Sequence, residues 1–327
     1  MDYGIRGLFE QLVLGRAAVP QQCTLGLPDP QQEVRVWLEG AGSPLDVTSN
    51  HVVACASPLL VGVGLDDARR RQALSGTVSL KIRERCGKAR LLADFALQFF
   101  DGVRAPGQEL SLFRVRSCRN HCLSLPRLWA YDLYKSFRRR RRDKHPEIRM
   151  SILGARSMSA LFICPRPVVL VTAIHEGAGN IFPMNLFGRI ADGHFAFALN
   201  SLRSAAPLVE RAGRVALSSI PLGFAEMVRS LGKNHRLEFV DWDTLPFPLA
   251  PSNAFGFPTP DFALRVRELE IDTVRRLGSH TLFFGRVVHD ERLRNEPQFC
   301  MIHGIYQAWR LSQGSQAARA TVREAQT

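Results

Sequence analysis

The segment that most constrains the fold covers residues 165–173 and continues, after a short turn, into residues 180–187. The first stretch, Pro-Arg-Pro-Val-Val-Leu-Val-Thr-Ala, is apolar and rich in β-branched residues, which is typical of a buried strand. Residues 175–179, His-Glu-Gly-Ala-Gly, supply turn formers. We therefore predict a hairpin whose second strand lies at a sheet edge or carries a bulge, because it contains Pro183.

Short strand-like segments separated by turn signals fill most of the remaining chain. Those of the first half are 34–38, 52–55, 59–65, 78–82, 91–100 and 110–115, and those of the second half are 195–200, 214–220, 262–271, 281–288 and 305–311. Helical spacing predicts helices within residues 1–25 and over 125–142, 204–211 and 223–231. Residues 244–259 read as an ordered loop. The pattern predicts a mainly β fold with short helices.

The two halves carry similar blocks in the same order. When Asp46-Val47-Thr48 is laid on Asn180-Ile181-Phe182, Val34 falls on Val168 and Leu65 on Leu199 without a gap. Further along, Asp-Phe-Ala-Leu occurs at residues 94–97 and again at 261–264. This order predicts a tandem repeat whose first copy is degenerate, since it lacks the Arg-Pro and Asn-x-x-Pro of the second.

The domain boundary is expected near residue 150, because His145-Pro146 ends the preceding helical pattern. Residues 1–150 would form a first domain with an N-terminal helix and a basic C-terminal helix. Residues 151–313 would form the second domain, and the small polar residues 314–327 a flexible tail.

Charge limits the partners. The net charge is +13, with 43 Lys and Arg against 30 Asp and Glu, and such a surplus attracts anions, from phosphorylated cofactors to nucleic acid. Much of it lies in the run 138–142, which is typical of a solvated helix end or linker, and no nucleic-acid-binding module accompanies it. No stretch reaches the roughly 18 apolar residues of a membrane helix, and a secretory pattern is missing. We expect a small-molecule substrate, a cytoplasmic location, and neither a nucleic-acid nor a membrane partner.

The absence of several known motifs disfavours the enzyme classes and metal sites that depend on them. The seven cysteines follow no framework spacing and are expected to be reduced core residues. Cys118-Arg119-Asn120-His121-Cys122 lacks a second ligand pair, so we predict no metal. A Gly-x-Gly-x-x-Gly turn, a P-loop and a nucleophile elbow are missing, which disfavours a Rossmann dehydrogenase and an α/β-hydrolase.

The strand, glycine turn and Asn-x-x-Pro of residues 165–187 resemble the opening of the flavin reductase-like family, the FMN-binding split β-barrels. Ser279-His280-Thr281-Leu282-Phe283-Phe284-Gly285 resembles the late strand of that family, and His303-Gly304-Ile305-Tyr306 its closing strand. The resemblance covers residues 155–311 well and 25–135 weakly. It implies two tandem split β-barrels. Family members are typically homodimers with flavin at the subunit interface, so a tandem copy would form an intramolecular pseudo-dimer, with a further homodimer left open.

The resemblance also implies a non-covalent FMN site. The cofactor-binding residues would be Asn180, Pro183, Met184 and Asn185 beside the ring, Ser201, Arg203 and Ser204 at the phosphate, and Tyr306 as a wall. His280 and His235 would be the catalytic residues. At the phosphate segment the usual Lys-Asp-Thr-like triplet is replaced by Arg203-Ser204-Ala205. An ordinary helix cap at Ser201–Ser204, a structural His280 and a packing role for Tyr306 remain the simpler alternatives.

The implied activity is that of an FMN-dependent oxidoreductase. Hydride would pass between a reduced nicotinamide, NADH or NADPH, and the flavin, and on to a second flavin or a small organic acceptor. Two alternatives stay open. One is a specialised biosynthetic flavoenzyme acting on a dedicated metabolite, and the other is a non-catalytic degenerate barrel that binds an anionic ligand or a partner.

Overall fold

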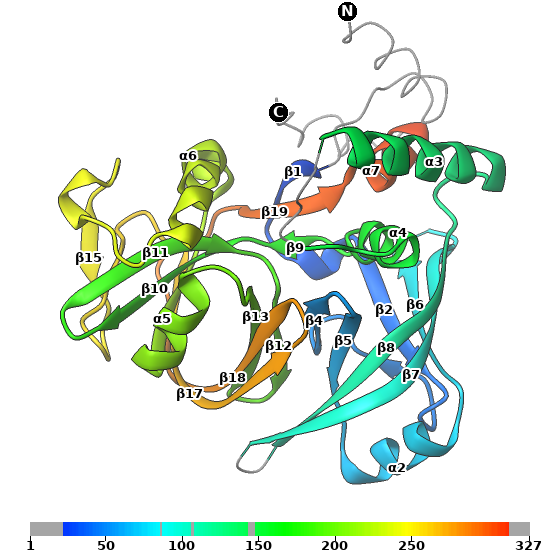
Figure 1. Cartoon of the computed structure of the whole chain (residues 1–327), viewed down its shortest axis with the longest axis horizontal. Helices are drawn as coiled ribbons and strands as arrows, with labels where there is room; N and C mark the ends of the chain where they lie inside the picture. Colours follow the sequence, from blue (N-terminus) through cyan, green and yellow to red (C-terminus); the bar gives the residue numbers. More distant parts are fainter. Residues whose placement is uncertain (1–21, 86, 106–107, 143–147, 314–327) are drawn as a thin grey trace, which may run out of the picture.

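The computed structural model describes residues 22–85, 87–105, 108–142 and 148–313. Two large curled β-sheets, one from each half of the chain, lie side by side (Figure 1). Each has seven antiparallel strands, and a three-stranded sheet and a two-stranded ribbon complete the β structure of the described residues. The predicted mainly β fold with short helices is confirmed.

The first sheet has the strand order β3-β2-β6-β7-β8-β5-β4. Its strands are β2 (Val34–Glu39), β3 (Leu45–Asp46), β4 (His51–Ala56), β5 (Leu59–Gly64), β6 (Val78–Glu84), β7 (Leu91–Ala105) and β8 (Gln108–Asn120). Helix α2 (Asp67–Ser75), capped by the Asp66 carboxylate on the Arg69 N–H, connects β5 to β6. Alternate residues of β2 are buried, so one face of this sheet covers a core.

The second sheet has the order β11-β10-β14-β17-β18-β13-β12. Its strands are β10 (Val169–His175), β11 (Ala178–Met184), β12 (Phe187–Ala191), β13 (His194–Asn200), β14 (Arg214–Ser219), β17 (Arg265–Leu277) and β18 (His280–Arg292), and α5 (Ala205–Ala212) connects β13 to β14. The two strand orders become identical when strands are matched in chain order, which is what a tandem copy would give. The repeated Asp-Phe-Ala-Leu does not take part, since Asp94 lies within β7 whereas Asp261 precedes β17.

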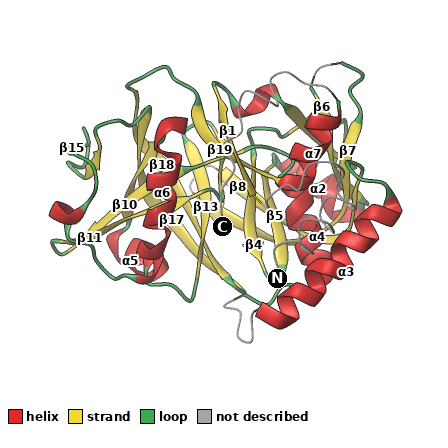
Figure 2. Cartoon of the chain, turned by 90° about the horizontal axis from the view of Figure 1, so that it is seen from above, coloured by secondary structure: helices red, strands yellow, loops and turns green. Residues whose placement is uncertain are grey.

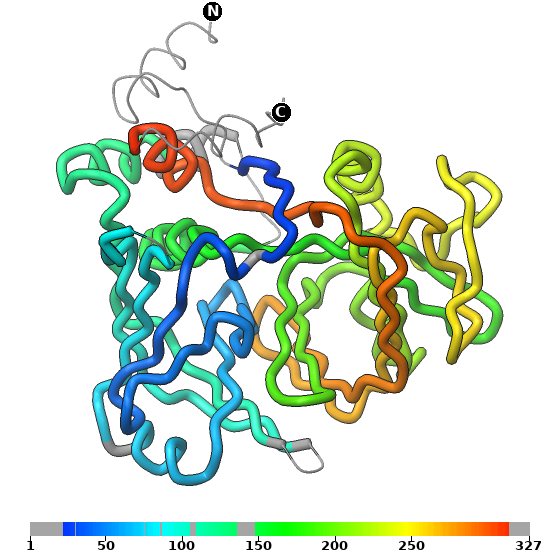
Figure 3. The backbone as a smooth tube through the Cα atoms, turned by 180° about the vertical axis from the view of Figure 1, so that it is seen from behind, coloured from blue at the N-terminus to red at the C-terminus, as the bar shows by residue number. Residues whose placement is uncertain are grey.

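A small third sheet ties the ends of the described chain together. Strand β1 (Gln22–Leu27) pairs with β19 (Gln298–His303), which also pairs with β9 (Arg166–Pro167). Figure 3 shows β1 and β19 running side by side above the two large sheets.

The strand predicted over 305–311 is wrong, because that segment is helix α7 (Gly304–Ser312). Its N-terminus is fixed by the His303 imidazole, which accepts the Ile305 N–H at 3.1 Å. Ile305, Tyr306 and Ala308 then enter the core of the first half. Helix α4 (Ile152–Leu161) likewise lies after residue 150 and packs on β8, and Ala160 and Leu161 belong to the same core. Two helices that lie beyond residue 150 therefore complete the core of the first half. The domain boundary near residue 150 stays a prediction.

The remaining elements flank the sheets. Helix α3 (Leu125–Arg142) spans the predicted residues. The predicted helix over 223–231 is the 3-10 turn η2 (Leu222–Phe224) followed by α6 (Ala225–Ser230) and η3 (Leu231–Arg236), and the loop 244–259 contains β15 (Leu249–Pro251), which pairs with β16 (Pro258–Pro260). Figure 2 shows α3, α4 and α7 over the first sheet and α5 and α6 over the second. The predicted N-terminal helix within residues 1–25 falls largely, and the tail 314–327 wholly, outside the described residues. No described helix is long and apolar enough to cross a membrane.

The two halves share an apolar interface, as a pseudo-dimer requires. Its buried side chains are Val52, Ala54, Cys55, Leu60, Val103, Leu110 and Leu112 from the first half and Ile190, Ala196, Ala198, Leu277, Leu282 and Phe284 from the second. The backbones also approach closely. A Cβ placed on Gly64 would lie 2.1 Å from the Ile190 carbonyl oxygen, and one on Gly188 would lie 2.2 Å from that of His51. Only glycine fits at these two contacts.

Candidate functional site

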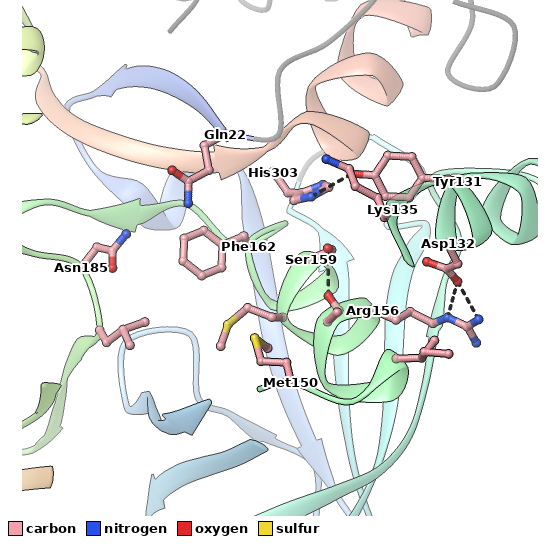
Figure 4. A pocket seen from close by; sticks show the side chains of 14 residues that line it. Gln22, Tyr131, Asp132, Lys135, Met150, Arg156, Ser159, Phe162, Asn185 and His303 are labelled. Carbon is pink, nitrogen blue, oxygen red and sulfur yellow. Dashed lines mark hydrogen bonds and ion pairs between the residues drawn. The ribbon is translucent and has the colours of Figure 1, made fainter. Parts of the chain in front are cut away.

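A cavity of about 260 Å³ lies where the two halves meet (Figure 4). It is lined by Gln22 of β1, by Tyr131, Asp132 and Lys135 of α3, by Met150, Ile152, Ala155, Arg156, Met158, Ser159 and Phe162 of the α4 segment, by Asn185 and Leu186 after β11, and by His303. Of the ten residues predicted from the sequence to form the site, Asn185 is the one that lines it.

The walls combine apolar surface with a few polar groups. Phe162, Met158 and Leu186 supply flat or adaptable apolar contacts. The amide nitrogen of Asn185 lies 3.5 Å from the Met301 sulfur. Because a thioether is a weak acceptor, this amide keeps the capacity to donate to a better acceptor in the cavity.

His303 is neutral at pH 7. Burial, and then the positive charge of Lys135, lower its pKa to about 3. Its Nδ1 accepts from the Ile305 backbone, so the single imidazole proton lies on Nε2, which is 3.5 Å from the Tyr131 hydroxyl. Lys135 lies over the Tyr131 ring, 5.3 Å from its centroid. Asp132 binds Arg156 at 2.6 Å, and Lys135 is a further cation in the cavity wall.

Three predicted residues, Ser201, Arg203 and His280, meet where β13 ends and β18 begins. The Ser201 and Thr281 hydroxyl oxygens are 3.0 Å apart, and His280 Nδ1 is 2.8 Å from the Ser279 hydroxyl. Burial lowers the pKa of His280 to about 4, and the Arg203 charge adds to the effect. His280 is therefore neutral at pH 7.

This cluster is linked to the cavity wall by two hydrogen bonds through Ser57. The Ser57 N–H donates to the Ser279 hydroxyl at 3.0 Å, and the Ser57 hydroxyl donates to the Arg149 carbonyl at 2.9 Å. Arg149 directly precedes Met150, which lines the cavity. The phosphate segment predicted from the sequence thus lies beside the cavity rather than in its wall.

The other predicted residues hold η3 against β11. Asn180 is fully buried and donates to the carbonyls of Asn234 and Leu237 at 2.9 and 2.8 Å. His235 Nε2 is 2.7 Å from the Pro183 carbonyl oxygen. The Ser204 hydroxyl donates to the Arg236 carbonyl, and Met184 is part of the core of the second half. These contacts give Asn180, Pro183, Met184, Ser204 and His235 positions outside the cavity.

Tyr306 also lies apart from the cavity, because α7 carries it into the core of the first half, where it is 2% exposed. Sequence reasoning missed Phe162, Lys135, Tyr131 and Gln22, which line the cavity instead. A signal for α4 was present, since Ser151 caps the helix by accepting the Gly154 N–H. No motif marked the cavity-facing side chains of α3.

The cysteines form no site in the described part of the chain. All six described cysteines are free, and five of them are buried. Burial raises the pKa of Cys122, a residue of the first core, and also that of Cys118. No group of three or more potential metal ligands occurs among the described residues.

Comparison with known proteins identifies the second half. Residues 160–309 match the family described as the flavin reductase like domain, so this part of the chain is a flavin reductase-like domain. No curated protein matches the chain.

Several solved structures are similar to part of it. The FMN-binding protein from Thermus thermophilus with bound p-hydroxybenzaldehyde is 27% identical, with a TM-score of 0.38 over 43% of this chain and 82% of that one. The NADH:FAD oxidoreductase SgcE6 from Streptomyces globisporus C-1027 is 18% identical, with a TM-score of 0.41, 46% of this chain and 88% of that one. The styrene monooxygenase flavin reductase from Pseudomonas putida S12 is 22% identical, with a TM-score of 0.39 over 45% of this chain and 92% of that one.

Proposed function

We propose that the protein is an FMN-dependent oxidoreductase of the flavin reductase-like type, with the flavin ring in the cavity between the two halves. One observation carries the proposal. The cavity joins Asn185, within the flavin reductase-like domain, to α3 and α4 on the first half. The first half then acts as the second wall of one site.

The residues present suit a flavin. Its ring needs a flat apolar slot with polar donors at one edge, and Phe162, Met158 and Leu186 offer the slot while the Asn185 amide offers a donor. A volume of about 260 Å³ lies just below the roughly 300 Å³ at which sites for whole ligands begin. The cavity therefore suits the ring, and the ribityl phosphate would extend out of it.

We assign the phosphate to Ser201 and Arg203. A phosphate favours hydroxyl donors and a guanidinium, and the end of β13 brings both beside His280, whose neighbour Ser279 is linked through Ser57 to the cavity wall. Lys135, at the α3 side, is the competing cation.

When bound, the flavin would supply two-electron chemistry, taking hydride from a reduced nicotinamide and passing it to a second flavin or a small organic acceptor. The chain's own residues would position and shield it. His280 is neutral at pH 7, so it can donate or accept a hydrogen bond but carries no acidic imidazolium proton. His235 would hold η3 on β11 through the Pro183 carbonyl.

The test is flavin binding by the full chain. We expect FMN to bind with one equivalent per chain in calorimetry, with the absorbance of an oxidised flavin. Asn185→Leu should weaken binding roughly tenfold, the scale of one lost hydrogen bond in a closed site. Asn253→Leu is the matched control, because Asn253 is exposed and pairs with His289 outside the cavity. A wild-type protein that ignores FMN would overturn the proposal.

Stopped-flow mixing separates the reductase from the specialised enzyme. Bleaching of the bound flavin by NADH or NADPH supports the reductase. If the bound flavin stays oxidised with both nicotinamides but is reduced by another metabolite, the protein is an enzyme dedicated to that metabolite and not a nicotinamide-dependent reductase.

A further inference from the structure

A second pocket, of about 430 Å³, also lies between the halves and shares no lining residue with the cavity described above. Four arginines line it, Arg166, Arg189, Arg265 and Arg267, against two aspartates, Asp29 and Asp290. From the first half Thr48, Ser49 and His51 complete the wall. The pocket is therefore cationic.

Arg166 is the unusual member of this set. It is 4% exposed, and it contacts His51 Nε2 through one terminal nitrogen at 2.9 Å. Its Nε has no hydrogen-bond partner among the described residues, and no described carboxylate forms an ion pair with it. A guanidinium stays charged in proteins, and burying it without a counter-charge is costly. An anion in the pocket would remove that cost.

His51 orients Arg166 without neutralising it. His51 Nδ1 is 2.7 Å from the Val47 carbonyl, to which it donates. Nε2 is then the acceptor for the Arg166 N–H, and the imidazole is neutral. Burial and the Arg166 charge lower the pKa of His51 to about 3, so it stays neutral throughout the physiological range.

The neighbouring arginines share one carboxylate. Asp290 accepts from Arg265 at 2.6 Å and from Arg267 at 3.0 Å. Arg267 lies over the Phe195 ring, 4.8 Å from its centroid, and its side chain is 16% exposed. Burial lowers the pKa of Arg267, and the charges of Arg265 and Arg189 lower it further. Positive charge thus exceeds negative charge on this side of the pocket as well.

The internal repeat explains the position. The alignment that lays Asp46 on Asn180 also lays His51 on Asn185, so the repeat relates the His51 side of this pocket to the Asn185 side of the proposed flavin cavity. The counterpart of the phosphate segment follows β5 and carries Asp66 and Asp67 together with Arg69, Arg70 and Arg71. None of these residues lines the pocket, so an anion bound there would be recognised by the pocket's own arginines.

We propose that this pocket is a second binding site for a small oxyanion metabolite, whose phosphate or carboxylate group binds Arg166 and Arg267. Planar guanidinium groups bind either group through paired hydrogen bonds. Phe187, Pro165 and Pro167 supply an apolar wall for the rest of the molecule.

The experiment is calorimetric titration of the full chain, already saturated with FMN, with inorganic phosphate and separately with succinate. We expect one anion per chain for at least one probe. Arg189→Gln, an exposed substitution at the rim, should weaken it roughly fivefold, and Arg166→Met should weaken it by more than roughly tenfold. Arg286→Gln is the control, because it removes the same charge from an exposed pair with Glu270 outside the pocket.

The outcomes separate the sources. Binding of phosphate alone assigns a phosphorylated metabolite, and binding of succinate alone assigns a carboxylate. Failure of both probes, or equal weakening by Arg189→Gln and Arg286→Gln, overturns the site. If Arg166→Met does not fold, the anion affinity of the Arg189→Gln protein decides the test. The titration is repeated without FMN, and we expect the same anion affinity, which would show that this site does not depend on flavin binding.

Discussion

The Tyr306 hydroxyl donates to Glu33 Oε2 at 3.2 Å, although 273 residues separate the two in the sequence. Arg310, one turn further along α7, binds the other oxygen of the same carboxylate at 2.9 Å. Arg310 is 4% exposed. The last described helix is thus fixed by a largely buried carboxylate to the segment that begins the first sheet, and the second half cannot separate without opening the core of the first.

Glu33→Gln should therefore destabilise the whole protein. It leaves the buried Arg310 guanidinium without its counter-charge, which costs about 3 kcal/mol of unfolding free energy. Tyr306→Phe removes only one hydrogen bond and should cost about 1 kcal/mol. Urea denaturation measures both.

The matched control is Glu238→Gln, since Glu238 pairs with Arg211 on the surface and is 69% exposed. Its effect should stay within about 0.5 kcal/mol. Similar losses in Glu33→Gln and Glu238→Gln would show that the Glu33 pair does not hold the halves together.

The contact of Gly188 with His51 predicts a second sensitive point. A methyl group on Gly188 would lie 2.2 Å from the His51 carbonyl oxygen, so backbone would have to move. Gly188→Ala should cost about 1–3 kcal/mol, the range for overpacking. Gly223→Ala has open space around the new methyl group and should change stability little. A Gly188→Ala protein as stable as the Gly223→Ala protein would contradict the close approach of the halves.

The strands could be predicted because their signals are local. Apolar alternation marked β2 and β6, and helical spacing marked α3 over its full described length. Helix α7 could not be separated from a strand by its apolar residues alone, since short apolar runs fit both. Its helical state depends on the His303 cap and on the space beside Glu33, which are tertiary.

The candidate site was predictable only in part, for a related reason. Asn185 follows a recognisable hairpin, and that motif predicts it as a site residue. Phe162 and Lys135 reach the same cavity from helices that pack there across the two halves. Nothing in the local sequence of α3 shows which of its faces meets Asn185, because that depends on how the repeat folds back on itself.

Three buried histidines predict a loss of stability in mild acid. The pKa values of His51, His280 and His303 are lowered to about 3, 4 and 3, mainly by burial. The unfolded chain takes up these protons below about pH 6.5 whereas the folded chain does not, so stability is complete above that pH and is lost as the pH falls. The expected slope is at most about 1.4 kcal/mol per pH unit for each histidine.

Urea denaturation between pH 7.5 and 5 measures this slope in a range where unperturbed carboxyl groups, with pKa values near 4, contribute little. His280→Gln should reduce this slope by at most about 1.4 kcal/mol per pH unit, which corresponds to the uptake of one proton fewer per molecule on unfolding. An unchanged slope in that variant would show that His280 protonates as easily in the folded chain as in the unfolded chain.

Arg203 provides the sharpest test of where the flavin phosphate lies. Arg203→Gln should weaken FMN binding by roughly 10- to 100-fold, because a charge-assisted hydrogen bond contributes about 1.5–3 kcal/mol. It should also raise the pKa of His280 above about 4, since the Arg203 charge helps to lower it, and NMR titration of the flavin-free protein reports that change independently. Arg211→Gln, on the exposed face of α5 beside Glu238, is the control and should alter neither. If FMN binds equally to the two variants while the His280 pKa moves in Arg203→Gln alone, the phosphate lies elsewhere, and Lys135 in the cavity wall becomes its cation.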